Sequence, residues 1–258
     1  MKKYLLDLKV VENVRLATNF TLLKLHGDEP LPDMLPGQFA EIRVDDAPHT
    51  FLRRPISINY VDRKQNDVWF LIQLVGEGTH RLANLKLQDM VNVLLPLGNG
   101  FPMPECQDEK LLLVGGGAGT APMLYFGERL LQMGIRPTFL LGARTADMLL
   151  QLEEFSKYGD VYTTTEDGSH GEKGFVTQHS ILQKKAFDRI CCCGPKPMMV
   201  SVAKYAKANG ITCEVSLENK MACGLGACLC CVENTNEGNV CVCKEGPVFN
   251  INDLLWQI

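Results

Sequence analysis

The chain has 258 residues, with 26 Lys and Arg against 30 Asp and Glu, and 46% of its residues are hydrophobic. This composition is typical of a globular protein and excludes a disordered chain, and the length suits two domains. The formal net charge of -4 provides no basic excess that would neutralise phosphate backbones. We therefore do not expect nucleic-acid binding.

No stretch of the chain approaches the roughly 18 uninterrupted apolar residues of a membrane span. The N-terminal apolar run is broken by Asp7 and Lys9 before it reaches the length of a signal-peptide core. We therefore expect no membrane association and a location in the reducing cytoplasm. There the 11 cysteines are better suited to metal ligation or to burial as thiols than to disulfides.

Residues 1–100 contain short β-rich runs separated by Gly, Pro, Asn and Asp. Alternating or clustered apolar residues at strand length, without helices between them, predict an antiparallel β-barrel or sandwich. The six predicted strands cover residues 4–14, 20–27, 37–44, 53–61, 67–76 and 90–98. Residues 96–105 hold three of the thirteen prolines and mark the seam to the next region.

Residues 101–217 alternate strands with helices, which predicts βαβ units and a parallel sheet of the α/β class. We expect strands at 110–117, 136–144, 160–167, 187–194 and 211–218. The predicted helices cover 120–134, where Gly134 is placed as the C-terminal cap, and 148–158, 176–185 and 198–208.

Residues 218–258 carry six cysteines and too little apolar material for an independent core. Cys223, Cys228 and Cys231 have the spacing C-x4-C-x2-C, and Cys243 follows after eleven residues, which is the plant-type arrangement for a 2Fe-2S cluster. Gly224 and Gly226 suit such a loop, because they allow backbone amides to turn toward the sulfurs.

Other assignments of these cysteines stay open. Cys230 could replace Cys231 as a ligand, and Cys241 could replace Cys243. A structural zinc site normally has paired C-x2-C motifs, of which only one is present, and the thiols could also be free. The remaining cysteines fall largely in predicted strands, and we expect core thiols at Cys106, Cys191, Cys192 and Cys213.

A glycine-rich segment, residues 115–122, joins a predicted strand to a predicted helix. It lacks the G-x-G-x-x-G spacing, but glycines and a helix start together favour a pyrophosphate, with a plain structural turn as the alternative. Cys193-Gly194-Pro195 repeats the pattern after a later strand, where an open parallel sheet gathers its ligands. The acids Glu166 and Asp167 favour NAD over NADP, because carboxylates repel a 2'-phosphate.

In the barrel region, Arg54 and Ser57 lie three residues apart within an apolar strand. Arg54 suits a phosphate and Ser57 suits a hydrogen bond to a flavin edge, although a surface arginine and a polar strand residue would look the same. Gly78 and Thr79 follow the next strand and form a second candidate phosphate contact.

The motifs RPIS, GEGT, GGGAGTAPM, CGPKPM and the cysteine segment ending in GPVF occur in the order seen in the ferredoxin-NADP reductase superfamily. Over nearly all residues the chain most resembles the electron-transfer subunits of NAD-linked, class 1B dihydroorotate dehydrogenases. The resemblance implies an FAD-binding barrel (1–100), an NAD-binding α/β domain (101–217) and a 2Fe-2S domain (218–258).

The resemblance also implies which residues bind each group. The FAD contacts would be Arg54, Pro55, Ile56, Ser57, Leu71, Ile72, Gln73, Gly78 and Thr79. NAD would be bordered by Gly115, Gly116, Gly117, Gly119, Thr120, Ala121, Pro122, Cys193, Gly194 and Pro195. The cluster ligands would be Cys223, Cys228, Cys231 and Cys243.

For function, the resemblance implies electron transfer from dihydroorotate, oxidised at FMN in a separate catalytic subunit, through the cluster and FAD to NAD+. The implied assembly has two copies of each subunit, and this chain shows no dihydroorotate site or catalytic residue of its own. Rival interpretations are the small subunit of an NADH-dependent ferredoxin-NADP oxidoreductase or of a sulfhydrogenase. A rival from another class is a non-catalytic interaction module that holds structural zinc.

Overall fold

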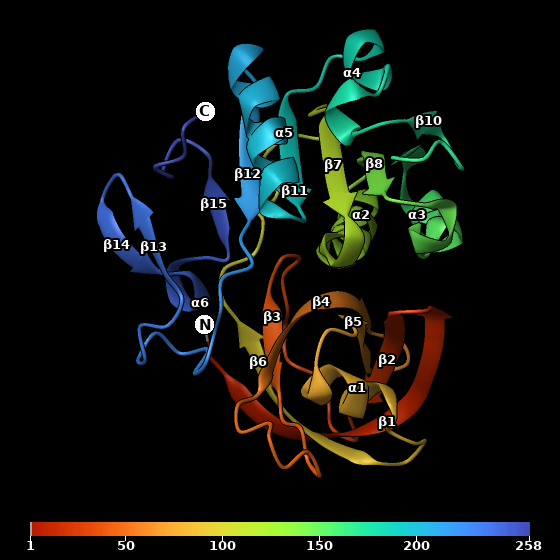
Figure 1. The fold of residues 1–258 in the computed structure, drawn as a ribbon, viewed down its shortest axis with the longest axis vertical. Coiled ribbons are helices and arrows are strands. Elements are labelled where there is room, and N and C mark those ends of the chain that lie inside the picture. Colours follow the sequence, from red (N-terminus) through yellow and green to blue (C-terminus); the bar gives the residue numbers. More distant parts are fainter. Residues whose placement is uncertain (1) are drawn as a thin grey trace.

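Residues 2–100 contain a closed barrel of six strands, as the alternating sequence predicts (Figure 1). The structure, a computed structural model, describes residues 2–258. Around the barrel the strand order is β1-β2-β5-β4-β3-β6, and all neighbours are antiparallel. The strands are β1 (Tyr4–Ala17), β2 (Phe20–His26), β3 (Phe39–Ile42), β4 (Arg54–Asp62), β5 (Asp67–Gln73) and β6 (Met90–Leu97). Their alternate side chains fill the barrel interior, which is why the apolar pattern identified them.

The barrel region also contains a short helix, α1 (Glu77–Ala83), where the sequence predicted none. The hydroxyl oxygen of Thr79 accepts hydrogen bonds from the backbone N–H groups of Val75 and Gly76, at 3.0 and 3.2 Å. These contacts fix the start of the helix. The expectation of strands without helices is wrong here. Gly76 and Gly78 have low helix propensity, and the sequence pattern does not show that Thr79 organises the first turn.

The second region is a parallel sheet built from the five predicted strands (Figure 1). They are β7 (Leu111–Gly116), β8 (Thr138–Ala143), β9 (Asp160–Thr165), β11 (Arg189–Cys193) and β12 (Thr212–Ser216). Two strands that were not predicted extend the sheet: β10 (Glu172–Lys173) beside β9, and β15 (Val248–Asn250), antiparallel to β12. The strand order is β10-β9-β8-β7-β11-β12-β15. The chain adds strands on one side of β7 as far as β10 and then continues on the other side with β11, so the topological switch point lies between β7 and β11. Open α/β sheets bind ligands at this point.

Helices cover both faces of this sheet. One face packs on α2 (Ala121–Gln132) and α3 (Leu152–Tyr158), and the other packs on α4 (Ile181–Lys184) and α5 (Lys196–Ala208). Short 3-10 turns occur at Gly117–Thr120, Ala146–Met148 and Val176–Gln178. The predicted cap at Gly134 is confirmed, with φ of 83° and a hydrogen bond from its N–H to the carbonyl of Leu131. In residues 2–258, no helix has the length and apolar character needed to cross a membrane.

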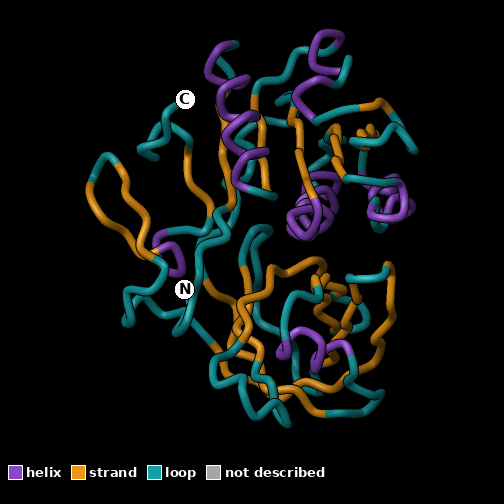
Figure 2. The backbone as a smooth tube through the Cα atoms, in the orientation of Figure 1, coloured by secondary structure: helices purple, strands orange, loops and turns teal. Residues whose placement is uncertain are grey.

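The C-terminal segment begins with a long loop after β12 and continues into a two-stranded hairpin (Figure 2). The elements are β13 (Val232–Thr235), β14 (Gly238–Cys241), α6 (Val242–Glu245) and β15. Val242 and Cys243 are fully buried in a core that also contains Phe39 and Leu97 of the barrel and Val215 of the sheet. The segment is therefore held partly by an apolar core that it borrows from the other two regions.

The predicted seam is the point where all three regions meet. The backbone N–H of Asn99 donates to the carbonyl of Gly246 at 2.6 Å, and its side-chain amide donates to the carbonyl of Glu245 at 2.9 Å. On the other side, the N–H of Leu217 donates to the carbonyl of Pro247 at 2.9 Å. The GPVF motif thus joins the end of the barrel to the last parallel strand of the sheet.

Candidate functional site: a cysteine loop beside a strand-to-helix turn

Residues 223–231, which we call the cysteine loop, surround sulfur atoms with backbone N–H groups. The N–H of Gly226 donates to Cys243 Sγ at 3.1 Å, that of Leu225 to Cys223 Sγ at 3.3 Å, and that of Cys243 to Cys231 Sγ at 3.4 Å. Gly224 and Gly226 have φ of 65° and 79°, a region open mainly to glycine. The expectation that these glycines turn amides toward sulfur is confirmed.

The thiols in and around the cysteine loop differ in acidity. Partial burial of Cys223 opposes ionisation, but the backbone N–H groups of Leu225, Cys228 and Ala227 outweigh it and lower the pKa of Cys223 to about 6. Burial and the nearby thiol of Cys231 raise the pKa of Cys243 to about 12, against the Gly226 N–H. A bound cation would keep such a buried sulfur deprotonated.

Within each ambiguous pair, the assigned cysteine is more buried than its alternative. Cys231 and Cys243 are buried, whereas Cys228 and Cys230 are exposed and Cys241 is half-buried. The thiol of Cys241 donates to the carbonyl of Gly226 at 3.8 Å. In the part of the chain that the structure describes, no three Cys, His, Asp or Glu side chains converge as the ligands of one metal ion would.

The cysteines outside the tail fall into two groups. Cys191, Cys192 and Cys213 are buried in β11 and β12, and burial raises the pKa of each thiol, so the prediction of core thiols is confirmed for them. The prediction is wrong for Cys106, which is exposed in the loop before β7. That loop follows the proline-rich seam and has no strand to bury the side chain.

The cysteine loop lies on the outer surface of the barrel. A Cβ on Gly224 would lie 2.8 Å from Cγ of Glu41 and 2.9 Å from a methyl carbon of Leu97, so the loop backbone contacts both side chains directly. Glu41 is 0% exposed, and neither carboxylate oxygen has a hydrogen-bond partner. Burial raises the pKa of Glu41 to about 7, although Arg54 and Arg53 act to lower it. Glu41 was not among the predicted site residues, because in the sequence it looks like an outward-facing polar residue of an ordinary strand.

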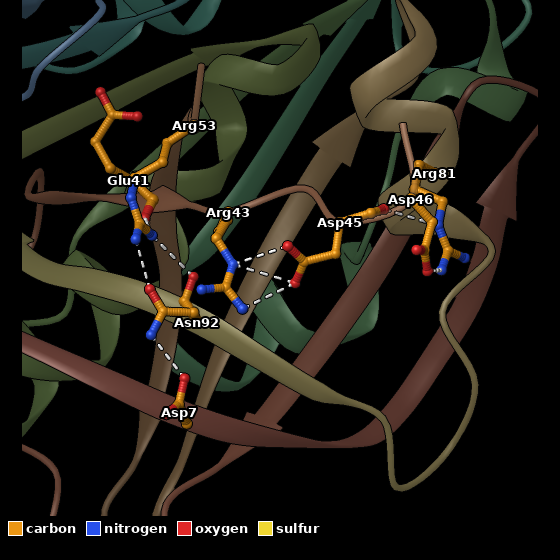
Figure 3. Close-up of polar contacts among 8 residues, drawn as sticks. All are labelled: Asp7, Glu41, Arg43, Asp45, Asp46, Arg53, Arg81 and Asn92. Carbon is orange, nitrogen blue, oxygen red and sulfur yellow. Dashed lines mark hydrogen bonds and ion pairs between the residues drawn. The ribbon is translucent and has the colours of Figure 1, made fainter. Parts of the chain in front are cut away.

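The two adjacent arginines of the RPIS segment have different surroundings. Arg53 donates to the backbone carbonyl and the side-chain oxygen of Asn92, at 3.1 and 2.5 Å, and Asn92 in turn donates to Asp7 (Figure 3). Arg54 donates only to the backbone carbonyls of Arg53 and Leu52, and within residues 2–258 it has no carboxylate at ion-pair distance. Arg54 is therefore the arginine whose charge is left for an anionic ligand.

The other predicted FAD contacts lie around Arg54 and along β5. A Cβ on Gly78 would lie 3.2 Å from Cδ of Arg54, so the start of α1 packs against the arginine side chain. The hydroxyl of Thr79 also donates to the carbonyl of Gly76 at 3.0 Å, so it organises the helix start and is not free for a phosphate. The side chain of Ile72 faces the barrel core, and the residue is paired with Thr21 of β2. The half-buried residues are Pro55, Ile56, Ser57 and Gln73.

The predicted nucleotide segments come together at the switch point of the sheet. Residues 115–122, which we call the nucleotide loop, leave β7 beside the end of β11, where Gly115 is paired with Cys193. A Cβ on Gly119 would lie 2.4 Å from backbone atoms of Cys193 and Gly194, so only glycine permits this approach. Leu71 of β5 packs in one cluster with Ala121 of the loop. The loop therefore borders both the sheet edge and the barrel.

The two acids after β9 have different roles. The carboxylate of Asp167 accepts hydrogen bonds from the N–H and the hydroxyl of Ser169, at 3.0 and 2.6 Å, and these contacts lower the pKa of Asp167. Glu166 is exposed. Asp167 is thus occupied in its own turn, and Glu166 is the carboxylate available to a ribose, so the preference for NAD stays a prediction.

The surroundings of the two sites suit the groups that the motifs predict. A cluster needs thiolates and N–H donors to sulfur, and the cysteine loop supplies both. A flavin nucleotide needs a free cation for its phosphates, and a nicotinamide nucleotide needs close backbone approach at a helix start. Arg54 and the nucleotide loop supply these.

Two regions of the chain match known domain families. Residues 218–255 match the iron-sulfur cluster binding domain of dihydroorotate dehydrogenase B, and residues 113–204 match the oxidoreductase NAD-binding domain. Among solved structures, a chain of the NADH-dependent reduced ferredoxin-NADP oxidoreductase has a TM-score of 0.86 at 29% identity, covering 96% of this chain and 90% of that one. The flavohem-like FAD/NAD binding domain of nitric oxide dioxygenase from Vibrio cholerae shares the fold, with a TM-score of 0.70 at 20% identity over 81% of this chain and 97% of that one.

Curated relatives match nearly the whole chain. The electron transfer subunit of dihydroorotate dehydrogenase B (NAD(+)) from Fusobacterium nucleatum is 37% identical over 257 residues, which cover 96% of this chain and 97% of the relative. The protein of the same name from Lysinibacillus sphaericus is 40% identical over 250 residues, covering 94% and 95%. At this identity and coverage, the chain belongs to the family of dihydroorotate dehydrogenase B (NAD(+)) electron transfer subunits.

Proposed function

We propose that this chain passes electrons from dihydroorotate oxidation to NAD+ in pyrimidine biosynthesis, with the oxidation itself occurring at FMN in a partner subunit. A hydride carries two electrons together and a 2Fe-2S cluster accepts one, so FAD, which exchanges both, links the two when bound. The proposal is supported by the family of the chain and by the match of residues 218–255 to the iron-sulfur domain of this enzyme class.

One structural observation carries the proposal: the cysteine loop packs directly on the barrel beside the RPIS strand. Gly224 contacts Glu41, and Glu41 lies opposite Pro55 in the β3–β4 pair. Cys231 and Cys243 share their core with Phe39, which lies opposite Ser57. A cluster held by this loop and a flavin held by β4 would be neighbours, as electron exchange between them requires.

The residues of each site form part of the proposal. Cys223, Cys228, Cys231 and Cys243 would hold the cluster, with backbone N–H groups directed at three of these sulfurs. Arg54 and the start of α1 would bind the phosphates of FAD, and the nucleotide loop with residues 193–195 would receive NAD. The corresponding domains would be 1–100, 101–217 and 218–258, the last of which shares its core with the other two.

The partner and its stoichiometry also belong to the proposal. The relatives are named as subunits, which implies a catalytic partner; we propose an FMN-containing dihydroorotate dehydrogenase subunit, two copies of each, in the cytoplasm. The similarity to the NADH-dependent reduced ferredoxin-NADP oxidoreductase chain keeps a bifurcating enzyme as the second candidate. Its 29% identity, against 37% and 40% for the curated relatives, makes it the weaker one.

The deciding experiment combines assembly with turnover. The chain is co-expressed with a dihydroorotate-oxidising FMN subunit, purified anaerobically, and analysed for iron, acid-labile sulfide, FAD and FMN. We expect two irons and one FAD for each copy of this chain, and NAD+ reduction that depends on dihydroorotate.

Two outcomes contradict the proposal in different ways. A complex that holds both flavins and the cluster but gives no dihydroorotate-dependent NADH excludes this substrate and favours the second candidate. A colourless protein that contains zinc and no iron after anaerobic reconstitution would support the structural-zinc interpretation, because zinc absorbs no visible light.

A further inference from the structure

An amide pair, in which Asn59 is buried and Gln151 is half-buried, connects the barrel to the α/β region. Asn59 on β4 is 0% exposed. Its Nδ2 donates to the carbonyl of Ala121 at 3.1 Å and to Oε1 of Gln151 at 3.2 Å, and Nε2 of Gln151 donates back to Oδ1 of Asn59 at 3.0 Å. Ala121 belongs to the nucleotide loop and Gln151 precedes α3, so one side chain holds two elements of the α/β region.

Asn59 and Gln151 both lie in irregular backbone. Along the β4–β5 pair the register runs from Ile58 opposite Phe70 to Tyr60 opposite Trp69, which leaves Asn59 as the extra residue of a β-bulge. Gln151 has φ of 56° and ψ of 29°, the left-handed conformation that a non-glycine residue adopts only at a cost. Bulges redirect side chains and are common next to active sites. Two independent distortions of the chain therefore converge on one contact.

Other polar contacts near the pair also fix how the barrel is oriented relative to the α/β region. Tyr60 and Tyr158 join their hydroxyl groups at 3.0 Å across the same boundary, and the Tyr125 hydroxyl donates to the carbonyl of Met34 at 3.1 Å. An apolar contact would hold the two regions together equally well but would tolerate sliding. The reciprocal amide pair is satisfied in one register only, because a displacement leaves polar groups of the buried Asn59 unpaired.

The position of Asn59 connects the two proposed cofactor sites. It follows Ser57 by two residues on the strand proposed to hold the flavin, and it bonds to Ala121 in the loop proposed to hold the nicotinamide nucleotide. We propose that Asn59 and Gln151 are positioning residues for hydride transfer, which keep the nucleotide loop at reacting distance from the flavin strand; this inference rests on the proposed function.

The expected size of the effect follows from the geometry of hydride transfer. Reacting atoms must come within about 3–3.5 Å, and a misplacement of about 1 Å can cost about a hundredfold in rate. Loss of the pair leaves the remaining interface in place, so we expect a smaller effect, about tenfold on the rate of hydride transfer. The affinity for NADH should change by less than about twofold, because neither side chain is offered to the nucleotide.

Gln151→Gly is the most informative variant. Glycine adopts the left-handed conformation without strain, so this change removes the side chain while relieving the backbone. The relieved strain offsets part of the cost of leaving Oδ1 of Asn59 without its partner. Gln88 gives a matched control: it has φ of 73°, is exposed, and lies in the loop before β6, away from the pair. Gln88→Gly makes the same substitution in the same backbone region without touching the contact.

The experiment uses the holoprotein carrying FAD and the cluster. Anaerobic stopped-flow follows bleaching of the flavin by NADH over a range of concentrations, which separates the limiting rate from the dissociation constant. Amide hydrogen exchange at residues 117–121 reports the mobility of the nucleotide loop without turnover. We expect Gln151→Gly to lower the limiting rate about tenfold and to raise exchange. Asn59→Ala also removes the hydrogen bond to the carbonyl of Ala121, so it should lower the rate at least as much, and the double variant should match Asn59→Ala.

The outcomes separate this inference from the proposed function. Wild-type rates in Gln151→Gly, or equal rate losses in Gln151→Gly and Gln88→Gly, overturn the positioning role. A lower thermal midpoint with an unchanged limiting rate for each folded molecule also overturns it, because that pattern describes a purely structural contact. If NADH fails to reduce wild-type FAD, the proposed function fails and this inference fails with it.

Discussion

The cysteines of the sheet and those of the cysteine loop differ in the surroundings of their sulfur atoms. Cys191, Cys192 and Cys213 lie in strands of the sheet, where burial raises the pKa of each thiol. In the cysteine loop, N–H groups point at sulfur, and the pKa of Cys223 is lowered to about 6 although partial burial opposes ionisation. Backbone N–H groups therefore favour the thiolate at Cys223, whereas burial keeps the three strand cysteines as thiols.

The largest expected effect comes from replacing a loop cysteine. Cys228→Ser should lower electron transfer from dihydroorotate to NAD+ by about a hundredfold or more, because a hydroxyl is a poor ligand for iron. FAD should stay bound, since the barrel contacts are untouched. Iron analysis, the flavin spectrum and turnover of the assembled complex measure the three quantities. Loss of FAD together with an unchanged cluster spectrum would mean that the two sites are wrongly assigned.

The backbone of the loop is tested by Gly224→Ala. The new Cβ would meet Glu41 and Leu97 at under 3.0 Å and would also occupy φ of 65°, so strain and overpacking add to about 3 kcal/mol. Gly210→Ala is the matched control, because Gly210 has φ of 66° with open space around it and should cost about 1 kcal/mol. Chemical denaturation compares the two variants. Equal losses would show that contact with the barrel does not constrain the loop.

Sequence and structure agree where the pattern is local. Alternation identified all six barrel strands, and strand–helix alternation identified the five central strands of the sheet. The spacing of the cysteines and glycines also predicted a loop with amides turned toward sulfur. These features depend on residues within about ten positions of one another, which is the range over which periodicity and turn chemistry act.

The failures concern contacts between distant segments. Strand β15 is three residues long and exists because Val248 pairs with Ser216, a partner that periodicity does not specify. Glu41 has the sequence position of a solvent-facing residue, but it is buried and the cysteine loop lies against it. Asn59 is similar: the amide became recognisable as a contact once Gln151 and Ala121 were placed beside it.

The burial of Glu41, a carboxyl group beneath the cysteine loop, makes the stability of the protein depend on pH. Its pKa rises from the usual 4.5 to about 7 on folding, so the folded protein binds the extra proton between these values. The contribution of Glu41 to stability is therefore present below about pH 4.5 and is lost as the pH rises toward 7. Wild type should lose about 2 kcal/mol more than Glu41→Gln between about pH 5 and about pH 7.

Denaturation midpoints of both holoproteins at the two pH values give this difference directly. The groups that face Glu41 are Arg53, Arg54 and the thiol of Cys223, and all three are the same in wild type and variant. Subtracting the variant therefore removes their titration to first order, together with that of the exposed carboxylates. A difference that stays flat with pH would place the Glu41 carboxyl in contact with water.

The smallest effect should follow from removing a strand thiol. Cys213 is 1% exposed in β12 and packs in the core shared with α5, so Cys213→Ala leaves a small cavity that costs about 1 kcal/mol. Iron content, FAD content and turnover should equal those of wild type, since no backbone N–H within residues 2–258 donates to this sulfur and burial raises its pKa to about 12. Iodoacetamide should also leave Cys213 unmodified in the native protein, because the reactive thiolate is both scarce and enclosed. Loss of iron from this variant would contradict the separation of strand cysteines from cluster cysteines, because it would mean that a strand thiol belongs to the cluster site.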